Sequence, residues 1–114
     1  MFIAILLAAT APQSALPETV TYDEAVACAF IGIAYGMRAE HSDDAKREIT
    51  GLGVRYMEFA KSIGGKSDAE VVADMEPISG NIMARAEATS NPLGAIRSQW
   101  DVCVERSGLL PTAE

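Results

Sequence analysis

The two cysteines, Cys28 and Cys103, are the first side chains to consider for chemistry. Neither belongs to a CxxC redox motif or to the CxxCH motif of haem attachment. With one histidine in the chain, they do not complete a four-ligand zinc set. Two uses remain: a disulfide between them, or two buried thiols that pack as small apolar side chains. The cellular compartment decides between these uses, because disulfides persist where the surroundings are oxidising.

The only histidine, His41, lies among four carboxylates: Glu40, Asp43, Asp44 and, one helical turn further on, Glu48. Calcium and zinc sites need more ligands at defined spacing, and solvated residues of a loop and a helix start give the same pattern. No Ser-His-Asp set stands out, and no pair of carboxylates lies on an apolar face. We therefore predict no catalytic, metal-binding or cofactor-binding residue, and a chain that is not an enzyme.

The start of the chain decides the compartment. Every residue of Phe2–Ala9 is apolar, a length that suits the hydrophobic region of a secretory signal and is too short to span a bilayer. No Lys or Arg precedes this run, and Pro12 disfavours one cleavage point while Gln13 disfavours the other. We predict a signal peptide over residues 1–15 and a linker over 16–20. The alternative is an apolar N-terminal helix packed on the core.

Export would take the protein to the bacterial periplasm or outside the cell, where a bridge between Cys28 and Cys103 is expected. Closing a loop of this length stabilises a fold by about 4–5 kcal/mol in the chain-entropy model. That is a large share of the stability of a small domain. We therefore predict this disulfide.

The chain after the linker shows helical periods and no strand-like alternation. A first helix is predicted over 22–40, where Thr21 and Glu24 have the spacing of a capping box. The run Ala25–Met37 within it carries no charge. Because this helix is apolar nearly all round, it should lie at the centre of the fold.

A second helix is predicted over 43–63, with Ser42 as its N-cap and Gly64 and Gly65 at its end. Its apolar residues recur at alternating spacings of four and three, so they form one stripe on the helix. The stripe consists of Ala45, Ile49, Leu52, Tyr56, Phe59 and Ile63.

Ser67 and Glu70 form a second capping box, before an apolar period that continues through Pro77. Proline inside a helix removes one hydrogen bond and clashes with the carbonyl four residues back. We predict either one kinked helix or two nearly collinear helices, over 68–76 and 78–89.

The last helix is predicted over 92–107, with Pro92 at the favoured first position. Trp100 and Cys103 lie on its inner face, as Cys28 does on that of the first helix. Gly108 is predicted to end the helix with a positive φ.

The predicted fold is all-α, a compact bundle of four to five helices tied by one disulfide. A chain of 114 residues is long enough for one domain. We place this domain at residues 21–110, followed by a C-terminal tail over 111–114. No membrane span is expected after the leader is removed.

Glycines interrupt both central helices: Gly32 and Gly36 form a GxxxG pattern in the first, and Gly51 and Gly53 lie in the second. Each costs about 1 kcal/mol relative to alanine in a helix interior, so the missing side chains should serve a purpose. One purpose is close packing of the two helix backbones. The alternative is a groove near Gly32 and Gly36 for an apolar ligand or a partner helix, which the methionines would make adaptable.

The net charge is −7, from 16 acidic and 9 basic side chains. Such a balance repels phosphate backbones, so we expect no nucleic acid partner. Apolar residues make up 49% of the chain and charged residues 22%, which indicates a folded domain and not a disordered one.

The layout, with a leader, a short acidic helical domain and one cysteine in each of its outer helices, resembles that of periplasmic acid-stress chaperones and of some immunity proteins for secreted toxins. The resemblance covers the layout alone, and no motif residue carries over from it. Export, one bridge and the missing catalytic set predict a non-enzymatic protein that binds another protein, as an inhibitor, immunity factor or chaperone. The alternative is a carrier of a small apolar ligand in the groove near Gly32 and Gly36.

Overall fold

The computed structural model describes residues 19–38 and 40–111. Four α-helices follow one another, and a short 3₁₀-helix ends the fold: α2 (Tyr22–Gly36), α3 (Asp43–Gly64), α4 (Asp68–Glu87), α5 (Pro92–Arg106) and η2 (Ser107–Leu109). The predicted all-α fold is confirmed, and these ranges contain no strand. The predicted signal peptide, the first three residues of the linker and the last three of the tail lie outside the described residues.

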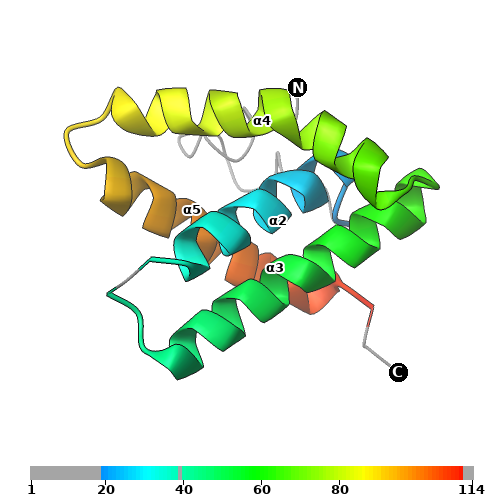
Figure 1. Cartoon of the computed structure of the whole chain (residues 1–114), viewed down its shortest axis with the longest axis horizontal. Helices are drawn as coiled ribbons and strands as arrows, with labels where there is room; N and C mark the ends of the chain where they lie inside the picture. Colours follow the sequence, from blue (N-terminus) through cyan, green and yellow to red (C-terminus); the bar gives the residue numbers. More distant parts are fainter. Residues whose placement is uncertain (1–18, 39, 112–114) are drawn as a thin grey trace.

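The α2 helix lies in the middle of the molecule, with α3 against one side and α4 and α5 against the others (Figure 1). Its residues 24–29 and Ile31 are fully buried. The central place predicted from its uncharged sequence is therefore confirmed. The C-terminal end of α2 is less covered, with Ile33 40% and Met37 70% exposed. Within the described ranges, no helix has the length and apolar character needed to cross a membrane.

Both ends of α2 differ from the prediction in an informative way. The Thr21 Oγ1 caps the helix by accepting from the Glu24 N–H at 3.2 Å. The reciprocal half of the predicted capping box is replaced, because the Glu24 carboxylate binds Arg106 instead. At the other end α2 stops at Gly36, before the predicted residue 40, because the chain turns there: the His41 N–H donates to the Arg38 carbonyl on the way into α3.

The predicted helices over 68–76 and 78–89 form one continuous helix, α4, which passes through Pro77. Both hydrogen bonds of the predicted capping box are present, from the Glu70 N–H to the Ser67 hydroxyl and from the Ser67 N–H to the Glu70 carboxylate. The helix survives its proline because Val71 and Ile82, on either side, are both buried in the same core. Figure 1 shows the axis of α4 changing direction along its length, as expected of a helix with an internal proline.

The end of α5 corrects one prediction. Gly108 does not take a positive φ; Gly65, which ends α3 with φ 62°, is the one glycine that does so among the described residues. The chain leaves α5 through the 3₁₀ turn η2 instead. This turn brings Leu110 into the core, where it is 6% exposed, while Leu109 stays half exposed.

The apolar stripe predicted on α3 faces the core along most of its length. Tyr56 is fully buried, and Ile49, Leu52 and Phe59 are partly buried against the core. The stripe loses its cover at its end, where Ile63 is 46% exposed. The period of the apolar residues therefore predicted the buried face of α3 correctly, and α3 extends beyond the core that it covers.

Gly32, Gly36 and Gly53 allow close packing of α2 and α3. A Cβ added at Gly32 would lie 2.9 Å from the Cα of Gly53 and 2.9 Å from the ring of Trp100. A Cβ at Gly36 would lie 2.7 Å from the Thr50 methyl group. Real Cβ atoms do not approach other atoms so closely, so a side chain at either position would push α3 away. Gly51, by contrast, has nothing within 4 Å of an added Cβ.

These distances predict opposite effects for two glycine substitutions. Gly32→Ala should lower the free energy of unfolding by about 1–3 kcal/mol, because the new methyl group overpacks the contact between α2 and α3. Gly51→Ala, the matched control on the exposed side of α3, should raise the free energy of unfolding by about 0.5–1 kcal/mol through helix propensity alone. Urea unfolding of the oxidised variants measures both changes. Equal stabilisation by the two substitutions would contradict the packing argument.

A polar contact joins the start of α2 to α4. The Tyr22 hydroxyl and the Lys66 ammonium both donate to the same oxygen of Asp74, each at 2.6 Å. The Lys66 ammonium also lies 4.8 Å from the centre of the Tyr22 ring, in cation–π contact. The hydrogen bonds from Lys66 and Tyr22 hold the pKa of Asp74 below its ordinary value of 3.8.

This lowered pKa predicts an acid-dependent contribution to stability. Above the ordinary carboxyl pKa, Asp74 is charged in both states and the contact stabilises the fold. As the pH falls, the unfolded chain takes up the proton first, and the contribution is lost as the pH passes the lower pKa of the folded state. The stability gap between wild type and Asp74→Asn should therefore shrink between pH ~6 and ~2. Urea unfolding across this range measures the gap, and a gap independent of pH would contradict the assignment.

Candidate functional site

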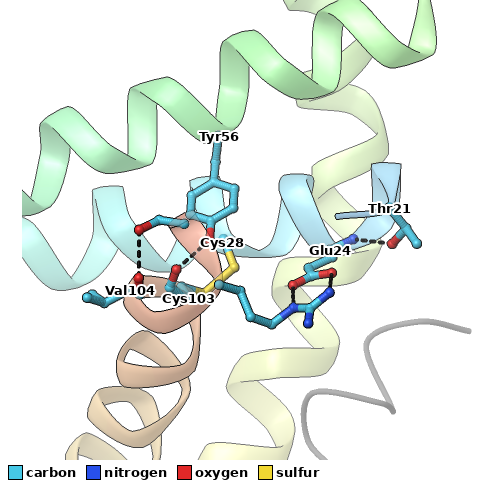
Figure 2. Close-up of a disulfide and its surroundings, with 8 residues drawn as sticks. Thr21, Glu24, Cys28, Tyr56, Cys103 and Val104 are labelled. Atoms are coloured by element: carbon cyan, nitrogen blue, oxygen red, sulfur yellow. Dashed lines mark hydrogen bonds and ion pairs between the residues drawn. A yellow bond between two sulfur atoms is a disulfide. The ribbon is translucent and has the colours of Figure 1, made fainter. Parts of the chain in front are cut away.

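The disulfide predicted between Cys28 and Cys103 is present and joins α2 to α5 (Figure 2). The two Cα atoms lie 5.8 Å apart, and both residues are fully buried. The inner-face positions read from the sequence therefore meet in the core. Such a bridge is typical of an oxidising compartment.

A buried ion pair lies beside the disulfide. Glu24 precedes Cys28 by one helical turn, and Arg106 follows Cys103 by one turn, so the two charged side chains meet where α2 and α5 meet. The guanidinium binds the carboxylate through two nitrogens, the second at 3.0 Å (Figure 2). The Glu24 side chain is fully buried and that of Arg106 is 12% exposed. A bidentate pair of this kind is both strong and directional.

Tyr56 on α3 completes this group. Its hydroxyl donates to the carbonyl oxygen of Cys103 (Figure 2). Burial raises the pKa of the Tyr56 phenol, and the nearby negative charge of Glu24 raises it further. The phenol therefore remains a neutral donor at ordinary pH. We call Glu24, Cys28, Tyr56, Cys103 and Arg106 the α2–α5 clamp, because together they fix these two helices to each other and to α3.

The arrangement of the clamp suits support and not catalysis. Its carboxylate and its phenol are both engaged in hydrogen bonds inside the core. Removing one partner of such a buried pair typically costs 3–5 kcal/mol, roughly a third of a small domain's stability or more. Sequence reasoning found the two cysteines and missed the ion pair. The available signal was Glu24 itself, a carboxylate directly ahead of a helix run without any charge.

His41 and its acidic neighbours do not form a common centre. The His41 ring packs edge-to-face on Tyr35, with the ring centroids 4.6 Å apart, and its buried Nε2 has no hydrogen-bond partner. Glu40 pairs with Arg38, which lowers the pKa of the Glu40 carboxyl, and Asp44 pairs with Arg47. Within the described residues, no three His, Cys, Asp or Glu side chains are grouped so as to hold a metal ion.

An apolar cavity of about 270 Å³ lies where the second half of α2 meets the end of α4 and the start of α5. Its walls include Phe30, Ala34, Met83, Leu93 and Ile96. Arg38 is the charged residue among its lining residues. The lining is mostly apolar with one cation, which is the usual composition of a small-ligand pocket.

The cavity is not at the glycines. The positions near Gly32 and Gly36 proposed from the sequence as a groove are filled by Gly53, Trp100 and Thr50. The open space lies on another side of α2, next to residues that no glycine pattern marks. Its position depends on how α2 packs against α4 and α5, which is a property of the tertiary fold.

Large apolar side chains are exposed around this end of α2. They are Ile33 on α2 and Met37 directly after it, at 40% and 70% exposure, and Met83 on α4, at 39%. Met83 also lines the cavity, which places the exposed methionine of α4 beside the second half of α2. We call these three residues the α2 edge.

Comparison with known proteins gives no family for this chain. No protein-family model matches it, and searches of curated proteins and of solved structures return no significant match.

The clamp predicts a strong dependence of stability on the disulfide. Replacing Cys28 and Cys103 together by alanine should lower the free energy of unfolding by about 4–5 kcal/mol, the loop-closure value for a bridge of this length. Urea unfolding of this variant and of the oxidised wild type measures the difference. A loss below about 1 kcal/mol would show that the unfolded chain gains little freedom when the bridge is absent.

Proposed function

We propose that this chain is an exported, non-enzymatic binding protein whose partner is another protein. The observation that carries the proposal is the α2 edge: Ile33, Met37 and Met83 are exposed on a scaffold whose central helix is fully buried over residues 24–29 and is held by a disulfide and an ion pair. A scaffold fixed in this way presents its surface without first having to be ordered, which favours binding.

The residue types at the α2 edge support a protein partner. Single exposed apolar side chains are common, whereas larger exposed apolar patches are typical of an interaction surface. Here Ile33 and Met37 are four residues apart, and Met83 lines the apolar hollow beside α2. Two of the three are methionines, whose flexible side chains adapt to the shape of a partner. Methionine is also enriched in protein interfaces relative to the rest of the surface.

The charge of the chain suggests what kind of partner fits. With a net charge of −7, the protein attracts surfaces of opposite sign and repels acidic ones. We therefore expect a partner with an apolar anchor residue surrounded by basic side chains. The disulfide supports an oxidising compartment for this encounter, in keeping with the predicted export.

A pair of matched substitutions tests the proposal. Met37→Glu places a charge in the α2 edge, and Val54→Glu places one at another exposed apolar position, on α3, where Val54 is 52% exposed. Proteins crosslinked to the oxidised wild type in native periplasmic extract are identified first, and their affinity for each variant is then measured with purified components. Met37→Glu should weaken binding at least tenfold, because an unpaired charge is buried on docking. Val54→Glu should leave the affinity unchanged.

Two results would count against this function. If both variants bind the crosslinked proteins as the wild type does, the α2 edge is not the docking surface. If Met37→Glu alters the circular dichroism spectrum, the comparison is repeated with Met37→Gln, which removes the apolar side chain without adding a charge. Unchanged affinity for that variant would also contradict the proposal.

A further inference from the structure

The apolar cavity between α2, α4 and α5 has a volume that suits a small ligand. Its volume of about 270 Å³ equals roughly nine water-sized groups, since one water occupies about 30 Å³. An unbranched chain of about eight carbons fits such a space. One wall is formed by Pro92 and Leu93 at the start of α5, where the proline nitrogen has no N–H to offer.

Arg38 gives the cavity its polarity. Its Nε donates to Glu40 at 2.7 Å, and this contact holds the guanidinium next to the cavity. A guanidinium carries five N–H donors, and the terminal nitrogens, which carry four of them, match a carboxylate in bidentate geometry. The Arg38 side chain is 47% exposed, so a ligand head group can reach it from solvent.

We infer that this cavity binds one free medium-chain carboxylate, with its alkyl chain between α2, α4 and α5 and its carboxylate on Arg38. This site goes beyond the proposed protein-binding function. The two surfaces share Met83, but Arg38 lines the cavity alone and Met37 belongs to the α2 edge alone, so substitutions at these two residues distinguish them. The chain as a whole repels anions, with its net charge of −7. Binding of an anion here therefore depends on the local cation.

Calorimetric titration of the oxidised full chain with octanoate, octanol and octylammonium tests the inference. Octanoate should bind with one-to-one stoichiometry and about tenfold or more tightly than octanol, because a charge-assisted hydrogen bond replaces a neutral one. Octylammonium should bind more weakly than octanol. Raising the salt concentration should weaken the binding of octanoate and leave the binding of octanol unchanged, since the ion pair is partly exposed.

Substitutions locate the two halves of the ligand. Arg38→Gln should lower the affinity for octanoate about tenfold, to the level of octanol. Ala34→Phe, at an exposed position on the wall, should abolish binding of both ligands by filling the cavity. Arg97→Gln is the matched control, because Arg97 lies on α5 and lines a separate, polar hollow. It should change neither affinity.

Each outcome decides the question. Equal affinity for octanoate, octanol and octylammonium would overturn recognition of the anion, and no binding of any of the three would overturn the site itself. Octanoate binding that survives Ala34→Phe would place the ligand elsewhere and also overturn the site. Circular dichroism of Ala34→Phe establishes that it is folded; if it is not, Met83→Phe fills the same cavity from α4. Failure of this test leaves the Met37→Glu comparison unaffected.

Discussion

The burial of α2 is the constraint on which the rest of the structure depends. From Ala25 to Met37 this helix has no charged side chain to turn towards water, so its neighbours must cover it on several sides. Covering a helix this completely requires a close approach, and Gly32 meets Gly53 and Trp100 at a distance that tolerates no Cβ. The cost of those glycines to helix propensity is offset by the apolar area that α3 and α5 then remove from water.

The first turn of α2 carries a charged side chain that has no access to water. Glu24 is fully buried, so its carboxylate requires a partner inside the fold. Arg106 supplies two hydrogen bonds from the end of α5, one helical turn from the disulfide. The covalent bond and the ion pair thus act on the same two helices at neighbouring turns, which fixes both their separation and their register. A buried ion pair is weak evidence for stability by itself, but the bidentate geometry of this pair requires a defined placement of the two side chains.

Local hydrogen bonds and inner-face periodicity made much of this fold predictable. Thr21, Ser42 and Ser67 cap their helices as predicted, because each cap needs only residues up to three positions away. The disulfide between Cys28 and Cys103 was predictable because the predicted export favours a bridge and each cysteine lies on the inner face of its helix. The partner of Glu24 was not predictable, since nine basic side chains were available and the sequence does not bring them together. The cavity was not predictable for the same reason, because three helices far apart in sequence form it. The glycine pattern indicated the other side of α2.

The position of the cavity follows from how α2 is covered. The clamp holds the C-terminal half of α5 against the first half of α2. The N-terminal end of α5 lies beside the second half of α2, where Leu93 and Ile96 line the cavity together with Phe30 and Ala34. Here the side chains of α5 and α4 no longer fill the space against α2, and the surface that remains is apolar because α2 has no polar face to offer. The same property that forces α2 into the core therefore produces an apolar hollow and an exposed edge where the cover ends. The clamp and the cavity share both helices, so the bond between Cys28 and Cys103 joins two of the helices that form the walls of the cavity.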